Sequence, residues 1–231
     1  MATSAARMTR ARKQAKLPAT LAELLRQLGD IPPERIALHA PPGRATEKHV
    51  IAALEAVDKR LYELVDGVLV EKAMGTRESL LASIIIQLLW NFVQKHDLGI
   101  VLGADGAMRL MPGLVRIPDV SFISWDRLPG RELPDAALAE LSPELAVEVL
   151  SASNTKGEME RKLRDYFRAG VRLVWVIQPK TQTAEVYTSP EHVQAVAKNQ
   201  SLDGGPVLPG FKLSLRQLFA RTQGRRGKGK K

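Results

Sequence analysis

The stretch SPELAVEVLSASNTKGEMERKL, residues 142 to 163, decides the fold because it joins a buried strand to an amphipathic helix. The run ELAVEVL has the length and β-branched composition of a strand at the centre of a sheet. A carboxylate, Glu148, stands within that run. Strand alternation places Val147 and Val149 on one face and Glu148 on the other. An unpaired carboxylate in an apolar interior is strongly unfavourable, so we expect Glu148 to have a specific partner.

The residues after this strand predict a helix from about residue 157 to residue 169. Thr155 takes the N-cap position and Glu158 the third helical position, which is the spacing of a capping box. Lys162 lies on the apolar stripe of this helix rather than on its outer side. Two roles are open for Lys162: an ion pair with Glu158 one turn earlier, or contact with the buried carboxylate. The apolar stripe consists of Met159, Leu163 and Tyr166.

The flanking segments predict the rest of an α/β fold. LYELVDGVLVEKA has two apolar runs around Asp66-Gly67, which is a strong hairpin signal. RESLLASIIIQLLWNFVQKHD has the periodicity of a long helix that covers a core. GIVLGADGAMRLM and VRIPDVSFIS predict two strands, and RLVWVIQP and TAEVYT predict two more. This order indicates an α/β domain with a mixed central β-sheet flanked by helices.

A second acid, Asp119, follows Pro118 near the start of a predicted strand. Carboxylates on separate strands of one sheet can converge on a divalent cation, and Mg²⁺ prefers oxygen ligands. We therefore expect Asp119 and Glu148 to share Mg²⁺, with Mn²⁺ as an alternative ion. Two structural explanations remain open, since Asp119 also suits a turn at the strand start and Glu148 also suits a hydrogen bond to a helix end.

Three segments together resemble a known family: YELVDGVLVE, IPDVSFIS and PELAVEVLSASNTKGEMERKLRDYFRAGVRLVWVIQP. The chain is similar to the bacterial family named "putative restriction endonuclease" in the PD-(D/E)xK nuclease superfamily. The resemblance covers roughly residues 62 to 188, and residues 144 to 179 are its most specific part. It implies a restriction-endonuclease-like core, Mg²⁺-dependent hydrolysis of DNA phosphodiesters, and a homodimer, because cutting both strands calls for two active sites.

The resemblance also assigns roles to individual residues. Asp119 matches the acid of the "PD" element and Glu148 the acid of the "ExK" element, both as metal ligands. Glu63 matches a further acid of the family, either as a ligand or as an outer partner. The chain departs from the superfamily pattern at Leu150, where lysine is usual. Lys162 is then the candidate to orient the attacking water or to stabilise the developing charge.

Chain length and charge distribution predict one domain with basic ends, and the resemblance implies that this domain is nuclease-like. The chain has 231 residues and a net charge of +9, but residues 1–16 and 221–231 hold eleven basic residues and no acid. We predict a disordered basic leader at 1–19, a helical extension at 20–60, the nuclease-like domain at 61–220 and a disordered basic tail at 221–231. The basic ends either attract a polyanion such as DNA or simply keep the chain in solution.

Composition excludes several other classes of protein. The absence of cysteine excludes disulfides and thiolate zinc sites. No apolar run reaches the roughly 18–20 residues of a membrane span, and no secretion signal is present. We expect a cytoplasmic protein with neither a membrane partner nor a small-molecule cofactor. Two functions are carried forward: a divalent-metal-dependent DNA endonuclease, and a non-catalytic nucleic-acid-binding or assembly protein on the same scaffold.

Overall fold

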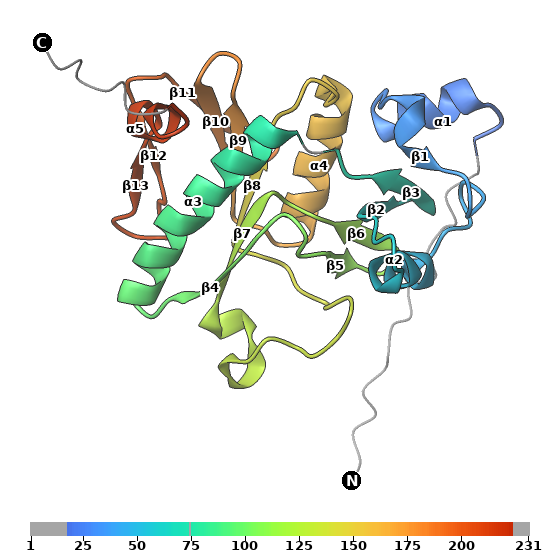
Figure 1. Ribbon diagram of the computed structural model, residues 1–231, viewed down its shortest axis with the longest axis horizontal. Coiled ribbons are helices and arrows are strands. Elements are labelled where there is room, and N and C mark those ends of the chain that lie inside the picture. The colour runs from blue at the N-terminus through green and yellow to red at the C-terminus, as the bar shows by residue number, and fades with distance from the viewer. Residues whose placement is uncertain (1–17, 74, 224–231) are drawn as a thin grey trace, which may run out of the picture.

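The computed structural model describes residues 18–73 and 75–223. Nearly all of the predicted basic leader and most of the predicted basic tail lie outside these residues. The described chain forms two main β-sheets with helices between and around them (Figure 1). None of its helices combines the length and the apolar character of a membrane span.

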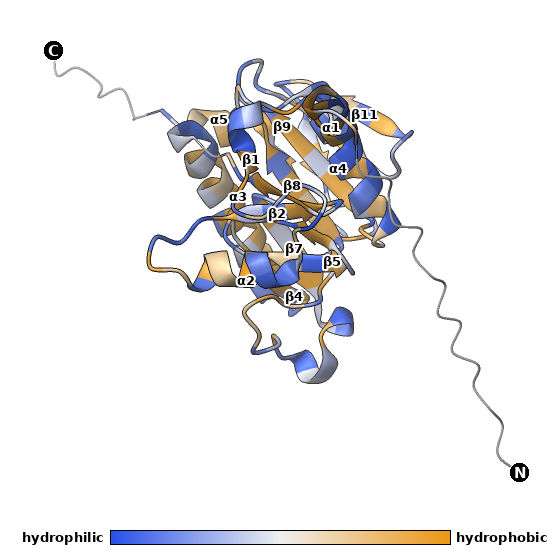
Figure 2. Ribbon diagram, turned by 90° about the vertical axis from the view of Figure 1, so that its right-hand side faces the viewer, coloured by the Kyte–Doolittle hydropathy of each residue, from blue (hydrophilic) through white to orange (hydrophobic). Residues whose placement is uncertain are grey.

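The larger sheet is mixed, as predicted. Its strands β8 and β9 run parallel, whereas its other neighbouring pairs are antiparallel. The parallel pair is central and apolar on both faces, and the hydropathy colouring shows it as a predominantly orange layer (Figure 2). In spatial order the six strands are β11 (Val193–Val196), β10 (Thr183–Tyr187), β9 (Leu173–Gln178), β8 (Leu145–Val149), β7 (Val120–Ser124) and β4 (Gly99–Leu102).

A second, five-stranded antiparallel sheet contains the predicted hairpin. Asp66 and Gly67 form its turn with positive φ values of 50° and 73°, which is the backbone that an Asp-Gly hairpin turn favours. The mixed central sheet that the sequence predicted is the larger one, and this smaller sheet is an addition that the sequence analysis did not separate from it. In spatial order the strands are β1 (Ile36–Ala37), β3 (Val68–Glu71), β2 (Tyr62–Val65), β6 (Leu114–Arg116) and β5 (Met108–Met111).

Two segments that each predicted one strand are divided between the sheets. GIVLGADGAMRLM forms β4 and β5, separated by a turn in which the Gly106 amide donates to the Gly103 carbonyl at 3.0 Å. VRIPDVSFIS, together with Leu114 before it, forms β6 and β7, which are separated at Pro118. A proline has no amide hydrogen to donate to a strand ladder, so the chain leaves one sheet there and enters the other.

Helices separate and cover the two sheets (Figure 1). The predicted long helix is confirmed as α3 (Thr76–Lys95), and it covers one face of the larger sheet together with β12 (Ser201–Asp203), β13 (Lys212–Ser214) and α5 (Leu215–Ala220). The predicted helix after β8 is α4 (Lys156–Arg168), which packs between the opposite face and the smaller sheet. Besides α1 (Leu21–Leu28), the described chain also contains α2 (Glu47–Glu55) and three short 3₁₀ turns, Pro33–Arg35, Trp125–Arg127 and Pro129–Arg131.

Residues 20–60, predicted as a helical extension, share the hydrophobic core of residues 61–220. The helix α1 (Leu21–Leu28) packs against α4, and β1 pairs with β3 at the edge of the smaller sheet. Arg35 donates two hydrogen bonds to the Glu158 carboxylate on α4, at 2.8 and 2.9 Å. This paired, bidentate geometry is the strongest form of a charge-assisted contact.

The predicted capping box at the start of α4 is only half formed. The Glu158 amide donates to the Thr155 hydroxyl at 3.0 Å, as an N-cap requires. The Glu158 side chain, however, accepts from Arg35 and from the side-chain Nδ2 of Asn154 rather than from the backbone of Thr155. Burial alone would raise the pKa of Glu158, but the hydrogen bonds from Arg35 and the charge of Lys162 lower it below its ordinary value.

We predict that Arg35→Ala destabilises the fold by about 3–5 kcal/mol, because it leaves Glu158 buried without its cation. Urea unfolding measures the difference. The lowered pKa means that this contribution is present above the ordinary carboxyl pKa and is lost as pH falls through the folded-state value. The difference in the free energy of unfolding between the wild type and Arg35→Ala should therefore become smaller at acidic pH.

The exposed pair of Lys156 and Glu160, 3.8 Å apart on the same helix, supplies the control. Because both side chains are solvated, Lys156→Ala should change stability by less than about 1 kcal/mol. Equal effects of Arg35→Ala and Lys156→Ala at neutral pH would contradict the prediction.

Candidate active site

Asp119 and Glu148 lie at the same end of the antiparallel pair formed by β7 and β8. Val120 pairs with Val147, and both of these valines point into the core beneath α3. Strand alternation therefore turns the adjacent Asp119 and Glu148 toward the opposite face, where α4 packs. Only 5% of Asp119 and 4% of Glu148 is exposed. The two acids predicted to share an ion thus face the same side of one sheet.

Glu148 receives contacts from two side chains of α4. The ammonium nitrogen of Lys162 lies 3.2 and 3.1 Å from the two carboxylate oxygens, and the Tyr166 hydroxyl donates to Oε1. Burial raises the pKa of Glu148, and the nearby acids Asp119 and Glu63 add to this effect, while the lysines oppose it. The partner expected from the sequence is therefore present.

Lys162 bridges two carboxylates that come from different sheets. Its Nζ lies 3.2 Å from Oε1 of Glu63 on β2 as well as beside Glu148 on β8. Burial by itself lowers the pKa of Lys162, but the charges of Glu148 and Glu63 raise it above its ordinary value, so the ammonium stays charged. Of the two roles left open for Lys162, the structure selects contact with the buried carboxylate over the pair with Glu158.

Asp119 is held by a second lysine that the sequence analysis missed. Lys72, directly after β3, places its Nζ 2.8 Å from Oδ1 of Asp119 and also donates to the Ile117 carbonyl. The amide of Val149 donates to Oδ2 of Asp119 at 2.6 Å. The sequence did contain a sign that Lys72 is buried. Val70 lies on a buried face of β3, and strand alternation places Lys72, two residues later, on the same face.

Arg116 is the other missed member of this cluster. It ends β6 and donates to Oε2 of Glu63 at 2.7 Å and to the carboxylate of Asp165 on α4. Burial alone would raise the pKa of Glu63, but the charges of Lys162 and Arg116 lower it well below its ordinary value. Glu63 is thus an ionised carboxylate, whether it acts as a ligand or as an outer partner.

The buried cluster contains one more acid than base among the described residues. Its acids are Glu63, Asp119, Glu148, Glu158 and Asp165, and its bases are Arg35, Lys72, Arg116 and Lys162. At the rim, Arg161 lies 2.6 Å from Asp66 and 3.9 Å from Asp165 of the cluster, and counting Arg161 and Asp66 together leaves the balance unchanged. The excess negative charge and the carboxylate oxygens suit a hard divalent cation.

A ready-made cage for such a cation is absent from the described part of the chain, where no group of three or more His, Asp or Glu side chains is arranged to enclose a metal. Mg²⁺ does not need one, since it is commonly held by one or two carboxylates and keeps several waters. The pair of Asp119 and Glu148 therefore fits Mg²⁺ as a two-carboxylate site. The lysine ammonium beside Glu148 is the group with which the cation would compete.

Comparison with known proteins agrees with this reading of the fold. The model of the Uma2 family, described as "Putative restriction endonuclease", matches residues 52–216, which is well over half of the chain. The chain belongs to this family. A crystal structure described as a "putative nuclease" from Anabaena variabilis is similar, with a TM-score of 0.62 and 18% sequence identity, over 69% of this chain and 90% of that one. No curated protein matches the Uma2-family chain.

The resemblance seen in the sequence is thus confirmed, and so is the restriction-endonuclease-like α/β fold. In this Uma2-family chain the structure brings all four predicted site residues into one connected cluster: Glu63, Asp119, Glu148 and Lys162. Their individual roles in metal binding and catalysis stay predictions. Leu150 follows Glu148 along the chain, and the ammonium that lies beside Glu148 comes from Lys162 on α4.

We predict that Lys162→Met destabilises the Uma2-family chain by about 3–5 kcal/mol, because Glu63 and Glu148 lose their shared buried counter-charge. Glu63 keeps its ion pair with Arg116 in this variant, so adding Glu148→Gln removes the carboxylate that has lost its cation and should restore part of the stability. Urea unfolding of the single and double variants measures both effects.

Arg164 is exposed on the same helix and provides the matched control. Arg164→Met should change stability by no more than about 0.5 kcal/mol. A Lys162→Met variant as stable as Arg164→Met would show that the buried ammonium has no net stabilising role.

Proposed function

We propose that this chain is a divalent-metal-dependent DNA endonuclease that hydrolyses phosphodiester bonds. The observation that carries the proposal is the convergence of Asp119 and Glu148 at one end of β7 and β8, with the Lys162 ammonium 3.1 Å from Glu148. Two carboxylates and a lysine form the minimal set that combines cation binding with stabilisation of a charged phosphate. Membership of the Uma2 family supports the reaction class.

In this proposal Asp119 and Glu148 hold Mg²⁺, or Mn²⁺ in its place, and Glu63 is either a further ligand or an outer partner. The ion, when bound, would lower the pKa of a water molecule and polarise the scissile phosphate. The remaining steps belong to side chains of the protein.

Lys162 supplies the positive charge that stabilises the negative charge developing on the phosphate. The raised pKa of its ammonium keeps it a cation rather than a general base. Lys72 and the Val149 amide fix the two oxygens of Asp119, so this carboxylate has one orientation. The Tyr166 hydroxyl does the same for one oxygen of Glu148.

DNA is the proposed substrate, and a homodimer is the proposed active form for cuts through both strands. Each chain would then supply one active site to one strand. Sedimentation of the protein at the concentration used for cleavage tests the dimer independently of the chemistry.

Cleavage of supercoiled and linear DNA with Mg²⁺ or Mn²⁺ tests the catalytic proposal. We expect Asp119→Asn and Glu148→Gln each to lower the rate by at least about 10²-fold, since each removes a ligand charge, and Lys162→Gln to lower kcat by about 10²–10³-fold. EDTA should abolish cleavage by the wild type.

Two exposed residues of α4 give matched controls for these variants. Glu160→Gln and Arg164→Gln remove the same kinds of charge outside the cluster and should cleave at the wild-type rate. Absence of cleavage by the wild type with either metal, or unchanged cleavage by Glu148→Gln, would remove the endonuclease proposal.

A second candidate function is a non-catalytic nucleic-acid-binding or assembly protein on the same scaffold. The observation that favours it is that Lys72 and Lys162 already compensate Asp119 and Glu148 without a metal. Titration calorimetry separates the two candidates. The endonuclease should bind Mg²⁺, and Asp119→Asn and Glu148→Gln should each abolish the heat of that binding. The alternative predicts no heat of Mg²⁺ binding. It also predicts that DNA binding is salt-sensitive and survives Glu148→Ala.

A further inference from the structure

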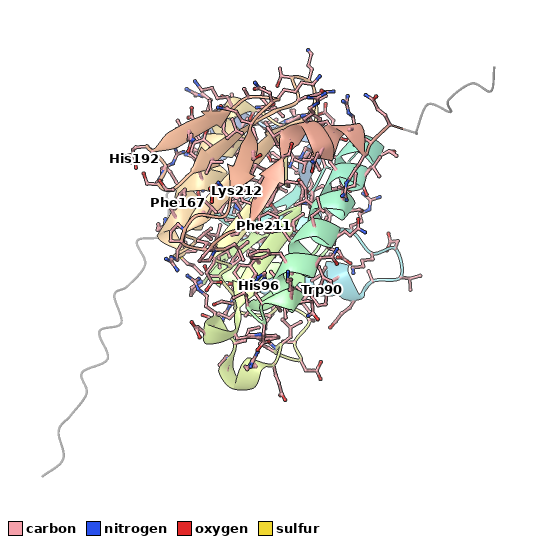
Figure 3. The ribbon with its side chains drawn as sticks, turned by 90° about the vertical axis from the view of Figure 1, so that its left-hand side faces the viewer. Trp90, His96, Phe167, His192, Phe211 and Lys212 are labelled. Atoms are coloured by element: carbon pink, nitrogen blue, oxygen red, sulfur yellow. The ribbon has the colours of Figure 1, made fainter. Side chains whose placement is uncertain are left out.

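Two adjoining hollows lie between the C-terminal half of α3 and the unit formed by β13 and α5. Their volumes are about 460 and 580 Å³, and they share Gln217 and Arg221 in their walls. Figure 3 looks at this side of the molecule, where Phe211 and Lys212 lie beside α3. Phe211 is buried and packs edge-on against Phe92, which gives the groove a rigid apolar floor. We call these joined hollows the α3–α5 groove.

The walls of the α3–α5 groove carry positive charge without negative charge. Lys95, Lys212 and Arg221 line it, and none of the lining residues is an acid. Within the described chain Lys95 and Arg221 make no ion pair, and Lys212 has only a 3.7 Å contact with Asp203. Because both side chains of that contact are largely exposed, it holds Lys212 weakly.

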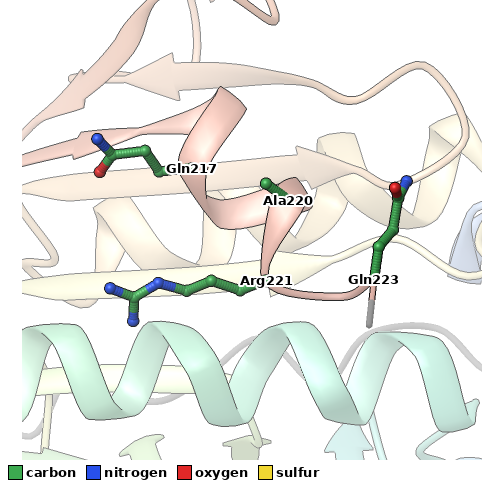
Figure 4. A pocket seen from close by; sticks show the side chains of 4 residues that line it. All are labelled: Gln217, Ala220, Arg221 and Gln223. Atoms are coloured by element: carbon green, nitrogen blue, oxygen red, sulfur yellow. The ribbon is translucent and has the colours of Figure 1, made fainter. Parts of the chain in front are cut away.

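Polar groups that donate hydrogen bonds lie among these cations. The side chains of Asn91, Ser214 and Gln217 also line the groove, and Arg221 lies between α5 and α3 (Figure 4). Phosphate oxygens in nucleic-acid complexes accept hydrogen bonds from this mixture of Lys, Arg, Ser, Asn and Gln side chains. A carboxylate-free groove with three cations has the charge and the donors that a phosphodiester backbone requires.

The amino-acid sequence extends the same charge beyond the groove. Arg221 and Gln223 line the hollow at the end of the described residues. The sequence then continues with five basic residues and no acid: Arg225, Arg226, Lys228, Lys230 and Lys231. The middle of the chain, by contrast, has slightly more acidic than basic residues. In the sequence, positive charge is therefore concentrated directly after the last residues that line the groove.

We propose that the α3–α5 groove binds the phosphate backbone of DNA, apart from the active site and without reading its sequence. This inference rests on the proposed function in taking DNA as the substrate. The groove lies on the α3 face of the larger sheet, whereas Asp119 and Glu148 face α4 on the other side. DNA held there is a segment other than the one being cut, so the groove contributes affinity and leaves the chemical step unchanged.

The test is binding of a fluorescent DNA duplex in EDTA, where no metal-dependent cleavage occurs. The triple variant Lys95→Gln, Lys212→Gln, Arg221→Gln should bind at least about tenfold more weakly at 100 mM salt. The slope of log affinity against log salt should fall by roughly two to three, because each phosphate contact contributes about 0.9.

A second triple variant removes the same charge elsewhere. Arg44, Lys48 and Lys59 are exposed and lie in or near α2 in the sequence. In Figure 1 the helix α2 lies on the opposite side of the molecule from α5. Changing all three to Gln should alter affinity by less than about twofold. Thermal unfolding checks that both triple variants are folded. If the groove triple variant is not folded, its three substitutions are tested one at a time.

Two results would overturn the groove proposal. Equal losses of affinity in both triples would mean that net charge alone governs binding, and an unchanged salt slope in the groove triple would mean that DNA does not contact it. Different results would contradict the endonuclease proposal: absence of DNA cleavage by the wild type, or an unchanged cleavage rate in the Glu148→Gln variant. At saturating DNA with Mg²⁺, the groove triple should retain the wild-type kcat.

Discussion

Burial of carboxylates between the two sheets is the constraint to which the remainder of the fold is adapted. Removing an ion from water is so unfavourable that a nearby opposite charge must offset it with good geometry and further hydrogen bonds. Here the offsetting cations come from four separate places: Arg35 before β1, Lys72 after β3, Arg116 on β6 and Lys162 on α4. Each ion pair ties one segment to another, so the position of α4 between the sheets is fixed by charge as well as by apolar packing.

The same contacts place stability and function in opposition. In the structure Lys162 contacts Glu63 and Glu148, and Lys72 contacts Asp119, so each of these carboxylates has a cation partner within the protein. A cation that enters must compete with these ammonium groups for carboxylate oxygens. Sites of this kind often carry such tension, because the arrangement that serves chemistry is seldom the one that is most stable.

Local patterns in the sequence were sufficient for much of the fold. The Asp66-Gly67 hairpin, the periodicity of α3, and the alternation that turned Glu148 toward α4 each depend on residues close together in the chain. The division into two sheets depends on strand pairing over long separations, which propensity does not encode. Pro118 was the local sign of that division, since it marks the point where the chain changes sheets.

The candidate site, like the fold, was predicted in part from the sequence. Asp119, Glu148 and Lys162 stood out because a charge within an apolar pattern is conspicuous, and the family resemblance added Glu63. Lys72 and Arg116 did not stand out, because Lys72 directly follows a short strand and Arg116 ends one, and a charged residue is ordinary at both positions. Only the register that sets Arg116 close to Glu63, and the side-by-side placement of the two sheets, gives them partners.

The short strand β1 has a consequence for how this protein can be shortened. The family match begins at residue 52, but β1 covers the outer edge of β3 and Arg35 neutralises Glu158 from the same segment. A fragment trimmed to the matched span would expose an unpaired strand edge, and such edges recruit other chains. Self-association of that fragment would then reflect the missing edge strand rather than any natural assembly of the whole chain.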